Sequence, residues 1–485
     1  MLFNSVTYIL FLPVVVLLYW RLPNRARLWL VLLSSVIFYG FWRIEFIPLM
    51  LFSAGADYVF ALMIERSENE RVRRRLLAIS VVISLSILCI FKYLIFFTST
   101  AWSISSWLGI ELSWPTLKII LPLGISFYIF ATISYTVDVY RRLIPAEKSA
   151  LTYFCFVTFF PHLVAGPILR AGVLMPQLSK RAAFKWENLA IGVRRILQGL
   201  FLKVVLADNL APLVNTAFLA DPVKLHGADA WTMAFLFGFQ IYFDFSAYSH
   251  IAIGSALLMG IVLPENFNFP YVATSPRDFW KRWHISLSTW VRDYLYVPLM
   301  GAHPKEPGWD VLAAPAEPGS TERKRTRALF VTWTLMGFWH GANWTFAVWG
   351  TYHAFCIWMQ RLLNAAPLKT RQLPPFAGWA ITLPLMMAAW IPFRAKGLRD
   401  AFILWGHMLD PRQFTNLTLE ANCYVAAALT LVGMMGVWAW RIFVLPALSR
   451  RAAVLRGAET AYYSSIIAFV FVFLEVRDQF IYFQF

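Results

Sequence analysis

The sequence predicts an all-α, polytopic membrane protein. Only 14% of its 485 residues are charged and 59% are hydrophobic, and the mean hydropathy is +0.59. Apolar stretches close to the roughly 20 residues of a helical span recur along nearly the whole chain. Because backbone groups in hydrocarbon must be bonded internally, spans of this kind are helices. We therefore expect one membrane domain over residues 1–485, where a soluble chain of this length would suggest two or three domains.

The hydrophobic elements follow one another in order, and two of them differ from the rest. The predicted elements are 5–20, 28–43, 45–63, 76–97, 118–138, 150–169, 187–218, 230–262, 284–300, 328–350, 352–364, 376–393, 422–445 and 460–475. The pieces 284–300 and 352–364 are too short or too broken to span, so we expect re-entrant or interfacial helices there. Residues 302–327, rich in Pro, Gly and charge, are predicted to be a polar loop.

The formal net charge of +17 comes from basic residues in short blocks between the apolar stretches. Cytoplasmic loops of membrane proteins have this distribution, so the charge does not indicate nucleic-acid binding. Arg21, Arg25 and Arg27 follow the first stretch, which lacks a basic region and a small-residue cleavage site before Arg21. We expect a retained first span with the N-terminus outside. The polar loop 302–327 is expected to be cytoplasmic.

His340 lies in an otherwise apolar segment, LFVTWTLMGFWHGANWTFAVWG, that has no formal charge. It follows Arg327 by thirteen residues, which is roughly 20 Å along a helix. Gly337 and Gly341 have a small-xxx-small spacing that allows another helix or a substrate to approach closely. Three neighbours are candidate supporting residues: Asn343 as a hydrogen-bonding group, and Trp339 and Trp344 as pocket walls. The alternative is a core histidine bonded to a neighbouring helix.

A second histidine, His284, lies in the charged run from Pro264 to Pro298. On a helix, His284, Ser288 and Arg292 would share one face at i, i+4 and i+8 and present a base, a hydroxyl and a cation. The basic residues beside this stripe could bind anionic phosphates or lipid head groups. We refer to the four of them as the basic collar: Arg277, Lys281, Arg282 and Arg292. The alternative is a solvated interfacial helix.

Asp244 lies with His250 in the apolar sequence GFQIYFDFSAYSHIAIG. A carboxyl group there orients a histidine or pairs with an arginine, and ion pairs of the second kind are common in helix bundles. Both readings remain open from the residues alone.

Missing motifs exclude several functions. The chain has no P-loop, no GxGxxG and no GxSxG sequence. Its four cysteines form no CxxC pair and its histidines lack ligand spacing, so no metal site and no bound cofactor are expected. Histidine-centred acid–base or acyl-transfer chemistry in a membrane remains.

Four segments together resemble the membrane-bound O-acyltransferase family, in its branch of bacterial alginate O-acetyltransferase membrane subunits. They are YFDFSAYSHIAIG, LPENFNFPY, FWKRWHISLSTWVRDYLYVPL and FWHGANWTFAVWG. Supporting stretches are LPLGISFYIFATISYTVDVYR, FFPHLVAGPILR, WIPFRAKGL and the terminal FIYFQF. The similarity preserves their order and runs from end to end.

The resemblance implies a ring of transmembrane and re-entrant helices around a central tunnel. It implies that His340 is the catalytic histidine and His284 the second signature histidine. The expected donor is acetyl-CoA, or an acyl carrier, on the cytosolic side of a bacterial inner membrane. The expected partners are membrane lipid and periplasmic proteins that modify an exported polysaccharide. Histidine suits the role of a general base, and a transient acyl-histidine is a second route.

Three departures from the family pattern affect the substrate more than the reaction. AYSH stands where relatives have GYSD, so His250 replaces an acidic residue. PLMG stands for PLGG, and the loop 302–327 is long. Alginate, acetylated cellulose, peptidoglycan and another exopolysaccharide all remain possible acceptors. Two other classes remain as alternatives: a transporter or flippase of a polysaccharide-export system, and a non-catalytic scaffold of a secretion complex.

Overall fold

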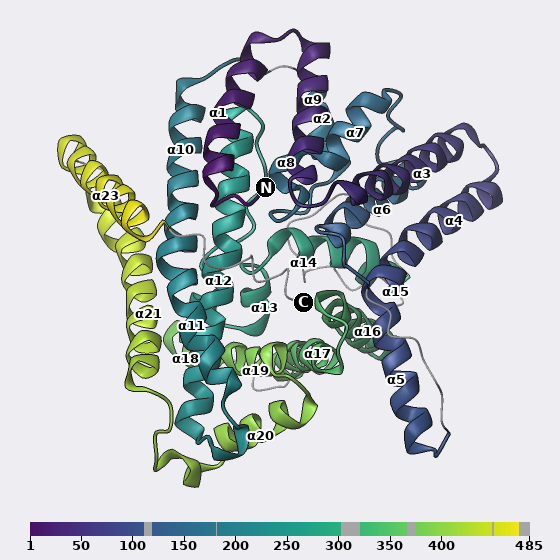
Figure 1. The fold of residues 1–485 in the computed structure, drawn as a ribbon. Helices are drawn as coiled ribbons and strands as arrows, with labels where there is room; N and C mark the ends of the chain where they lie inside the picture. Colours follow the sequence, from purple (N-terminus) through teal and green to yellow (C-terminus); the bar gives the residue numbers. More distant parts are fainter. Residues whose placement is uncertain (111–118, 181, 302–320, 366–373, 449–450, 475–485) are drawn as a thin grey trace. The chain divides into compact units, whose positions relative to one another are not determined.

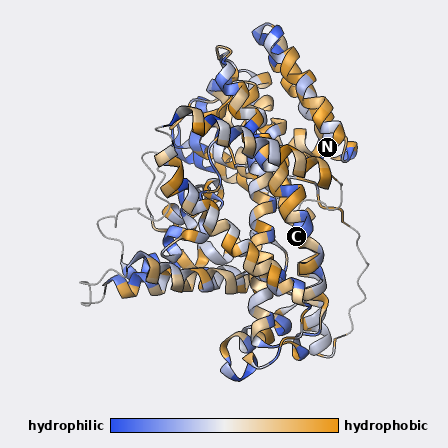
Figure 2. Ribbon diagram, turned by 90° about the vertical axis from the view of Figure 1, so that its left-hand side faces the viewer, coloured by the Kyte–Doolittle hydropathy of each residue, from blue (hydrophilic) through white to orange (hydrophobic). Residues whose placement is uncertain are grey.

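A computed structural model describes residues 1–110, 119–180, 182–301, 321–365, 374–448 and 451–474. All regular structure within these ranges is helical, which confirms the predicted all-α membrane protein (Figure 1). Four helical segments in the described ranges are long and apolar enough to cross a membrane: Ile44–Arg66, Glu70–Trp107, Pro375–Arg394 and Ala421–Ala447. Apolar residues recur along the helices in Figure 2.

The chain divides into two compact units, of which the first comprises residues 1–193 and 252–264. Its longer helices are α1 (Val6–Arg21), α2 (Asn24–Gly40), α3 (Ile47–Arg66), α4 (Glu70–Leu88), α5 (Leu94–Trp107) and α6 (Ile125–Tyr140). Two short helices, α7 (Ala150–Thr158) and α8 (Phe160–Leu163), and α9 (Ala171–Ser179) complete it. The predicted span 150–169 is therefore wrong, because the helix breaks at Phe159 before Pro161.

Buried polar groups connect two helices of the first unit. The carboxylate of Asp57 on α3 accepts hydrogen bonds from the hydroxyls of Ser80 and Ser84, one turn apart on α4. A buried carboxyl group needs such donors, because an unbonded polar group costs roughly 1–3 kcal/mol.

The second unit comprises residues 194–251 and 265–485. Two long helices cross the division between the units: α10 (Trp186–Leu200), which continues through a π-helical segment (Phe201–Ala207) into α11 (Asp208–Leu219), and α12 (Gly227–Leu258). Shorter helices follow: α13 (Pro276–Trp280), α14 (Ile285–Val291) and α15 (Val297–Leu299), with a π-helical segment (Arg292–Tyr296) between the last two. The remaining helices are α16 (Glu322–His340), α17 (Trp344–Ala365), α18 (Pro375–Ala388), α19 (Trp390–Arg394), α20 (Leu398–Leu409), α21 (Ala421–Ala439), α22 (Leu445–Leu448) and α23 (Ala452–Phe473).

The predicted break near residue 351 is wrong. The chain leaves the helix at Gly341, ten residues earlier, and α17 continues without interruption through 352–364. Gly341 is extended, with φ −163° and ψ 151°. The Oδ1 atom of Asn343 then accepts a hydrogen bond from the Thr345 backbone N–H at 3.0 Å. This local hydrogen bond favours the start of a new helix over continuation of α16. Within the predicted loop 302–327, residues 302–320 lie outside the described ranges, and α16 begins at Glu322.

Candidate active site

Helices α16 and α17 form an antiparallel hairpin that places His340 at its closed end. The two helices lie side by side in Figure 1 and make extensive contact. At the open end, the Arg361 guanidinium lies 3.6 Å from the Glu322 carboxylate. Midway along, the hydroxyls of Thr334 and Thr351 are 3.0 Å apart. His340 is the last residue of α16, so the helix delivers its imidazole to the turn.

Small residues allow the hairpin to close. A Cβ atom on Gly337 would overlap the carbonyl oxygen of Phe346, and one on Gly350 would overlap that of Trp333. A Cβ atom on Gly341 would collide with the Phe346 ring. The close approach predicted from the spacing of Gly337 and Gly341 is therefore confirmed, and α17 is the helix that approaches.

The His340 imidazole is packed among aromatic rings and is only 4% exposed. Its ring centroid lies 4.8 Å from that of Trp339, 4.9 Å from that of Trp349 and 5.2 Å from that of Phe393. Arg327 and His340 belong to one uninterrupted helix, so the predicted separation of roughly 20 Å along the axis holds. Burial of the histidine, expected from its apolar sequence context, is confirmed.

His284 directly precedes α14 and has a left-handed backbone, with φ 42° and ψ 56°. Its Nδ1 atom lies 3.1 Å from Oδ1 of Asn266. That oxygen also accepts from the backbone N–H and the hydroxyl of Ser286, which fixes the orientation of the amide. Nδ1 therefore carries the hydrogen in the neutral ring, and Nε2 carries the lone pair. Nε2 is buried and has no hydrogen-bond partner among the described residues.

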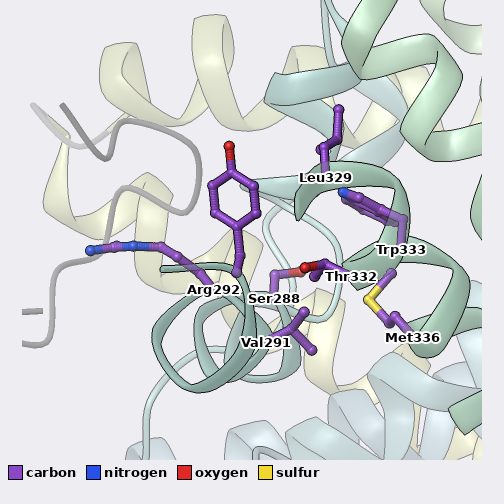
Figure 3. Close-up of a pocket in the computed structure, with 8 residues that line it drawn as sticks. Ser288, Val291, Arg292, Leu329, Thr332, Trp333 and Met336 are labelled. Carbon is purple, nitrogen blue, oxygen red and sulfur yellow. The ribbon is translucent and has the colours of Figure 1, made fainter. Parts of the chain in front are cut away.

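The predicted polar stripe of three residues is only partly correct. Ser288 and Arg292 line one pocket together with residues of α16, among them Thr332, Trp333 and Met336 (Figure 3). The cavity volume is about 20 Å³, enough for one water molecule. His284 does not line it, because the left-handed turn places its ring against Phe245, at a centroid distance of 4.6 Å.

The basic collar is also divided. Arg277, Lys281 and Arg282 do not line the pocket to which Arg292 belongs. The Nε atom of Arg282 forms an ion pair with Asp278 at 2.9 Å, whereas Lys281 is exposed. Arg292 pairs with its neighbour Asp293 at 3.2 Å, and its side chain is 11% exposed.

Asp244 forms a buried ion pair with Lys203, a residue that was not predicted from the sequence. The Lys203 ammonium lies 2.8 Å from Asp244 and 2.7 Å from Asp208, and all three side chains are almost fully buried. The ion-pair reading of Asp244 was right, but the expected arginine is a lysine. Lys203 lies within the apolar sequence LFLKVVLADNL, so hydropathy did not indicate a buried ion pair there.

His250 pairs with Arg195, whose Nη1 atom lies 2.9 Å from the histidine Nδ1. The same guanidinium pairs with Glu265. A carboxylate therefore lies next to Arg195, although His250 stands where the family resemblance implies an acidic residue.

The predicted supporting residues around His340 separate into two groups. Trp339 is buried against His340, but neither residue lines the pocket described above, so the role of Trp339 as a pocket wall stays a prediction. Trp344 is 48% exposed and packs on Phe338, so it does not wall the histidine. Asn343 bonds to the backbone of Thr345 and shapes the turn.

Several site residues were missed in the sequence. Trp349 and Phe393 contact His340, and Asn266 orients His284. A third buried histidine, His353, packs 4.8 Å from Trp349 and receives a hydrogen bond from the Trp280 indole at 3.4 Å. Trp349 and His353 are four residues apart and share a face of α17, but the predicted break near residue 351 placed them in two different elements and hid this relation.

The site lies in a chain whose relatives carry out acyl transfer. The family model "membrane-bound O-acyltransferase family" matches residues 86–314, a range that includes His284. Over 454 residues the chain is 37% identical to the "Probable alginate O-acetylase AlgI" of Azotobacter vinelandii, covering 90% of this chain and 86% of that protein. The chain belongs to the membrane-bound O-acyltransferase family.

Two further relatives agree with this assignment. The "Probable alginate O-acetylase AlgI" of Pseudomonas aeruginosa is 40% identical, with 89% of this chain and 81% of that protein covered. The "Peptidoglycan O-acetyltransferase" of Helicobacter pylori is 34% identical, covering 87% and 82%. This member of the membrane-bound O-acyltransferase family is thus a membrane enzyme, an O-acyltransferase.

Proposed function

We propose that this O-acyltransferase takes an acetyl group from a cytosolic donor, acetyl-CoA, and passes it across the bacterial inner membrane for O-acetylation of an exported polysaccharide such as alginate. The similarity to proteins named for alginate and for peptidoglycan O-acetylation supports acetyl as the group transferred. The observation that carries the proposal is the buried imidazole of His340 at the closed end of a helix hairpin. Periplasmic polysaccharide-modification proteins would receive or complete the transfer.

In this proposal His340 handles the proton or the acetyl group. As a general base it takes the proton from the acceptor hydroxyl while the hydroxyl oxygen attacks the acetyl carbon. As a nucleophile it first holds the acetyl group on a ring nitrogen. Both routes need a ring nitrogen with a free lone pair, and the imidazole lies among three aromatic rings.

The donor would approach from the side on which α16 begins with the basic sequence RKRTR. Basic loops of membrane proteins face the cytoplasm, where acetyl-CoA is available. Ser288 and Arg292 line the pocket against α16 and are the donor-binding residues that we favour; Arg277, Lys281 and Arg282 would serve encounter only.

The decisive experiment substitutes His340 in the producing cells. His340→Ala and His340→Asn should both lose at least about 100-fold of polymer acetylation at matched membrane levels, with polymer export intact. Asparagine retains hydrogen bonding but cannot accept a proton at neutral pH. The same exchange at His407, on α20, is the control. Loss of polymer export in the His340 variants would favour a transporter. If these variants keep both acetylation and export, and only deletion of the whole protein disrupts assembly of the secretion complex, a scaffold is favoured. Near-normal acetylation with His340→Asn would reject the catalytic role.

A further inference from the structure

Trp349 is the buried indole that packs directly on the candidate catalytic histidine from α17. Its ring centroid lies 4.9 Å from that of His340, with the ring planes at 81°. The side chain is 1% exposed. Phe393, at 5.2 Å, and His353, at 4.8 Å, pack on the same indole. Because several rings contact it, the Trp349 side chain is held in one orientation next to His340.

The indole N–H of Trp349 is buried without a hydrogen-bond acceptor among the described residues. Trp405 donates to the Ala388 carbonyl at 2.8 Å and Trp379 donates to the Tyr271 carbonyl at 2.9 Å. The Trp390 indole, 6.3 Å from Trp349, shares the lack of an acceptor among the described residues but does not contact His340 in the same way. Buried indole N–H groups usually find a partner, and an exception calls for a ligand or a catalytic explanation. A donor in this position would pair with an acceptor that arrives with the substrate.

We propose that the Nε1–H group of Trp349 binds the carbonyl oxygen of the acetyl group and stabilises the negative charge that develops on it during transfer. The inference rests on the proposed function, because it assumes that acetyl transfer occurs at His340. A fixed donor aimed at the developing oxyanion lowers the barrier most in a site that excludes water. It would make Trp349 a catalytic residue in addition to His340.

The step balances without any further reactant. The hydroxyl oxygen of the acceptor forms a bond to the acetyl carbon, and its proton passes to His340. The carbonyl π electrons move to the oxygen, where the Trp349 N–H donates to them. When the carbonyl re-forms, the carbon–sulfur bond breaks, and the leaving thiolate takes the proton from His340. The products are an acetyl ester and free CoA. In the acyl-histidine route the same oxyanion forms twice.

The test removes the N–H group and retains the ring. Inside-out membrane vesicles from polymer-producing cells are given radiolabelled acetyl-CoA, and label in the acetylated product is measured against donor concentration. Trp349→Phe should lower the maximal rate about 100- to 1,000-fold with the KM for acetyl-CoA changed less than about threefold. A second variant carries benzothienylalanine at position 349, which replaces N–H by sulfur in a ring of nearly the same shape. Trp405→Phe is the control, because its indole bonds to a backbone carbonyl elsewhere.

The outcomes separate the two proposals. A large loss of maximal rate in the benzothienylalanine variant, with normal membrane levels, supports the oxyanion role even if Trp349→Phe fails to fold. A maximal rate within about threefold of wild type in that variant overturns it, and the N–H would then serve only an ordered water. If wild-type vesicles transfer no acetyl from acetyl-CoA, the proposed function fails and this inference fails with it.

Discussion

His284 and His340 contact the same indole ring, that of Trp339. The centroid of this ring lies 6.2 Å from the His284 imidazole and 4.8 Å from the His340 imidazole. The two histidines come from separate parts of the second unit, one preceding α14 and the other ending α16. Under the proposed function, proton or acyl transfer would take place at His340 and His284 would position the donor.

The bond between Asn266 and His284 should affect the rate more than the fold. Asn266→Ala removes the acceptor for Nδ1–H, so the tautomer with its lone pair on Nε2 loses its main support. We expect acetyl transfer to fall about 10- to 100-fold. Asn266→Asp keeps an oxygen acceptor and should retain more activity than alanine. The measurement is polymer acetylation at matched protein levels; equal activity of both variants would reject this role.

The glycines of the hairpin should tolerate no methyl group. Gly337→Ala or Gly350→Ala places a Cβ atom on a backbone carbonyl of the partner helix, and overpacking of this kind typically costs about 1–3 kcal/mol or more. We expect a lower midpoint of thermal unfolding in detergent, and loss of acetylation because the closed end carries His340. Gly436→Ala on α21 is the matched control, since nothing lies within 4 Å of its Cβ position. Equal unfolding midpoints for the three variants would contradict close helix packing as the function of these glycines.

The helices, the burial of His340 and the importance of Gly337 and Gly341 followed from local sequence. Hydropathy predicts which segments are buried from water, and glycine spacing predicts where the backbones of two helices approach each other closely. The hairpin turn was misplaced because Gly341 to Asn343 lie within an unbroken apolar run, where hydropathy does not change. The reversal depends on one extended glycine and one side-chain bond from Asn343.

Contacts between distant segments were beyond the reach of pattern reasoning. Phe393 lies 53 positions from His340 and Asn266 lies 18 positions from His284, and no periodicity links such residues. Lys203 lies within an apolar run, and the sequence alone did not indicate which residues it pairs with. The left-handed backbone at His284 separated this histidine from the predicted stripe, because a helical-face argument assumes that every member of the stripe is helical.

Lys203 should be the most sensitive member of the buried ion cluster. Lys203→Met leaves two carboxylates without their cation, and breaking a buried pair in this way costs roughly 3–5 kcal/mol. Asp208→Asn or Asp244→Asn still leaves one carboxylate for the ammonium group, so the loss of stability should be smaller. Thermal unfolding of the purified proteins in detergent gives the order. Asparagine variants that are less stable than Lys203→Met would contradict the charge argument.

Arg292 should bind the donor, whereas Arg282 should not. Arg292 lines the pocket with Ser288, its guanidinium extending away from Trp333 and Met336, and its charge can reach an entering phosphate (Figure 3). A hydrogen bond to a charged group is worth roughly 1.5–3 kcal/mol, so Arg292→Gln should raise the KM for acetyl-CoA about 10-fold or more and leave the maximal rate within about threefold. Arg282→Gln is the matched control, because both guanidinium groups pair with an aspartate but only Arg292 lines the pocket. The slope of log KM against log salt should flatten more in Arg292→Gln than in Arg282→Gln, since screening weakens attraction between a cation and a phosphate. If Arg282→Gln raises the KM as much as Arg292→Gln does, the donor recognises the whole collar and not this pocket.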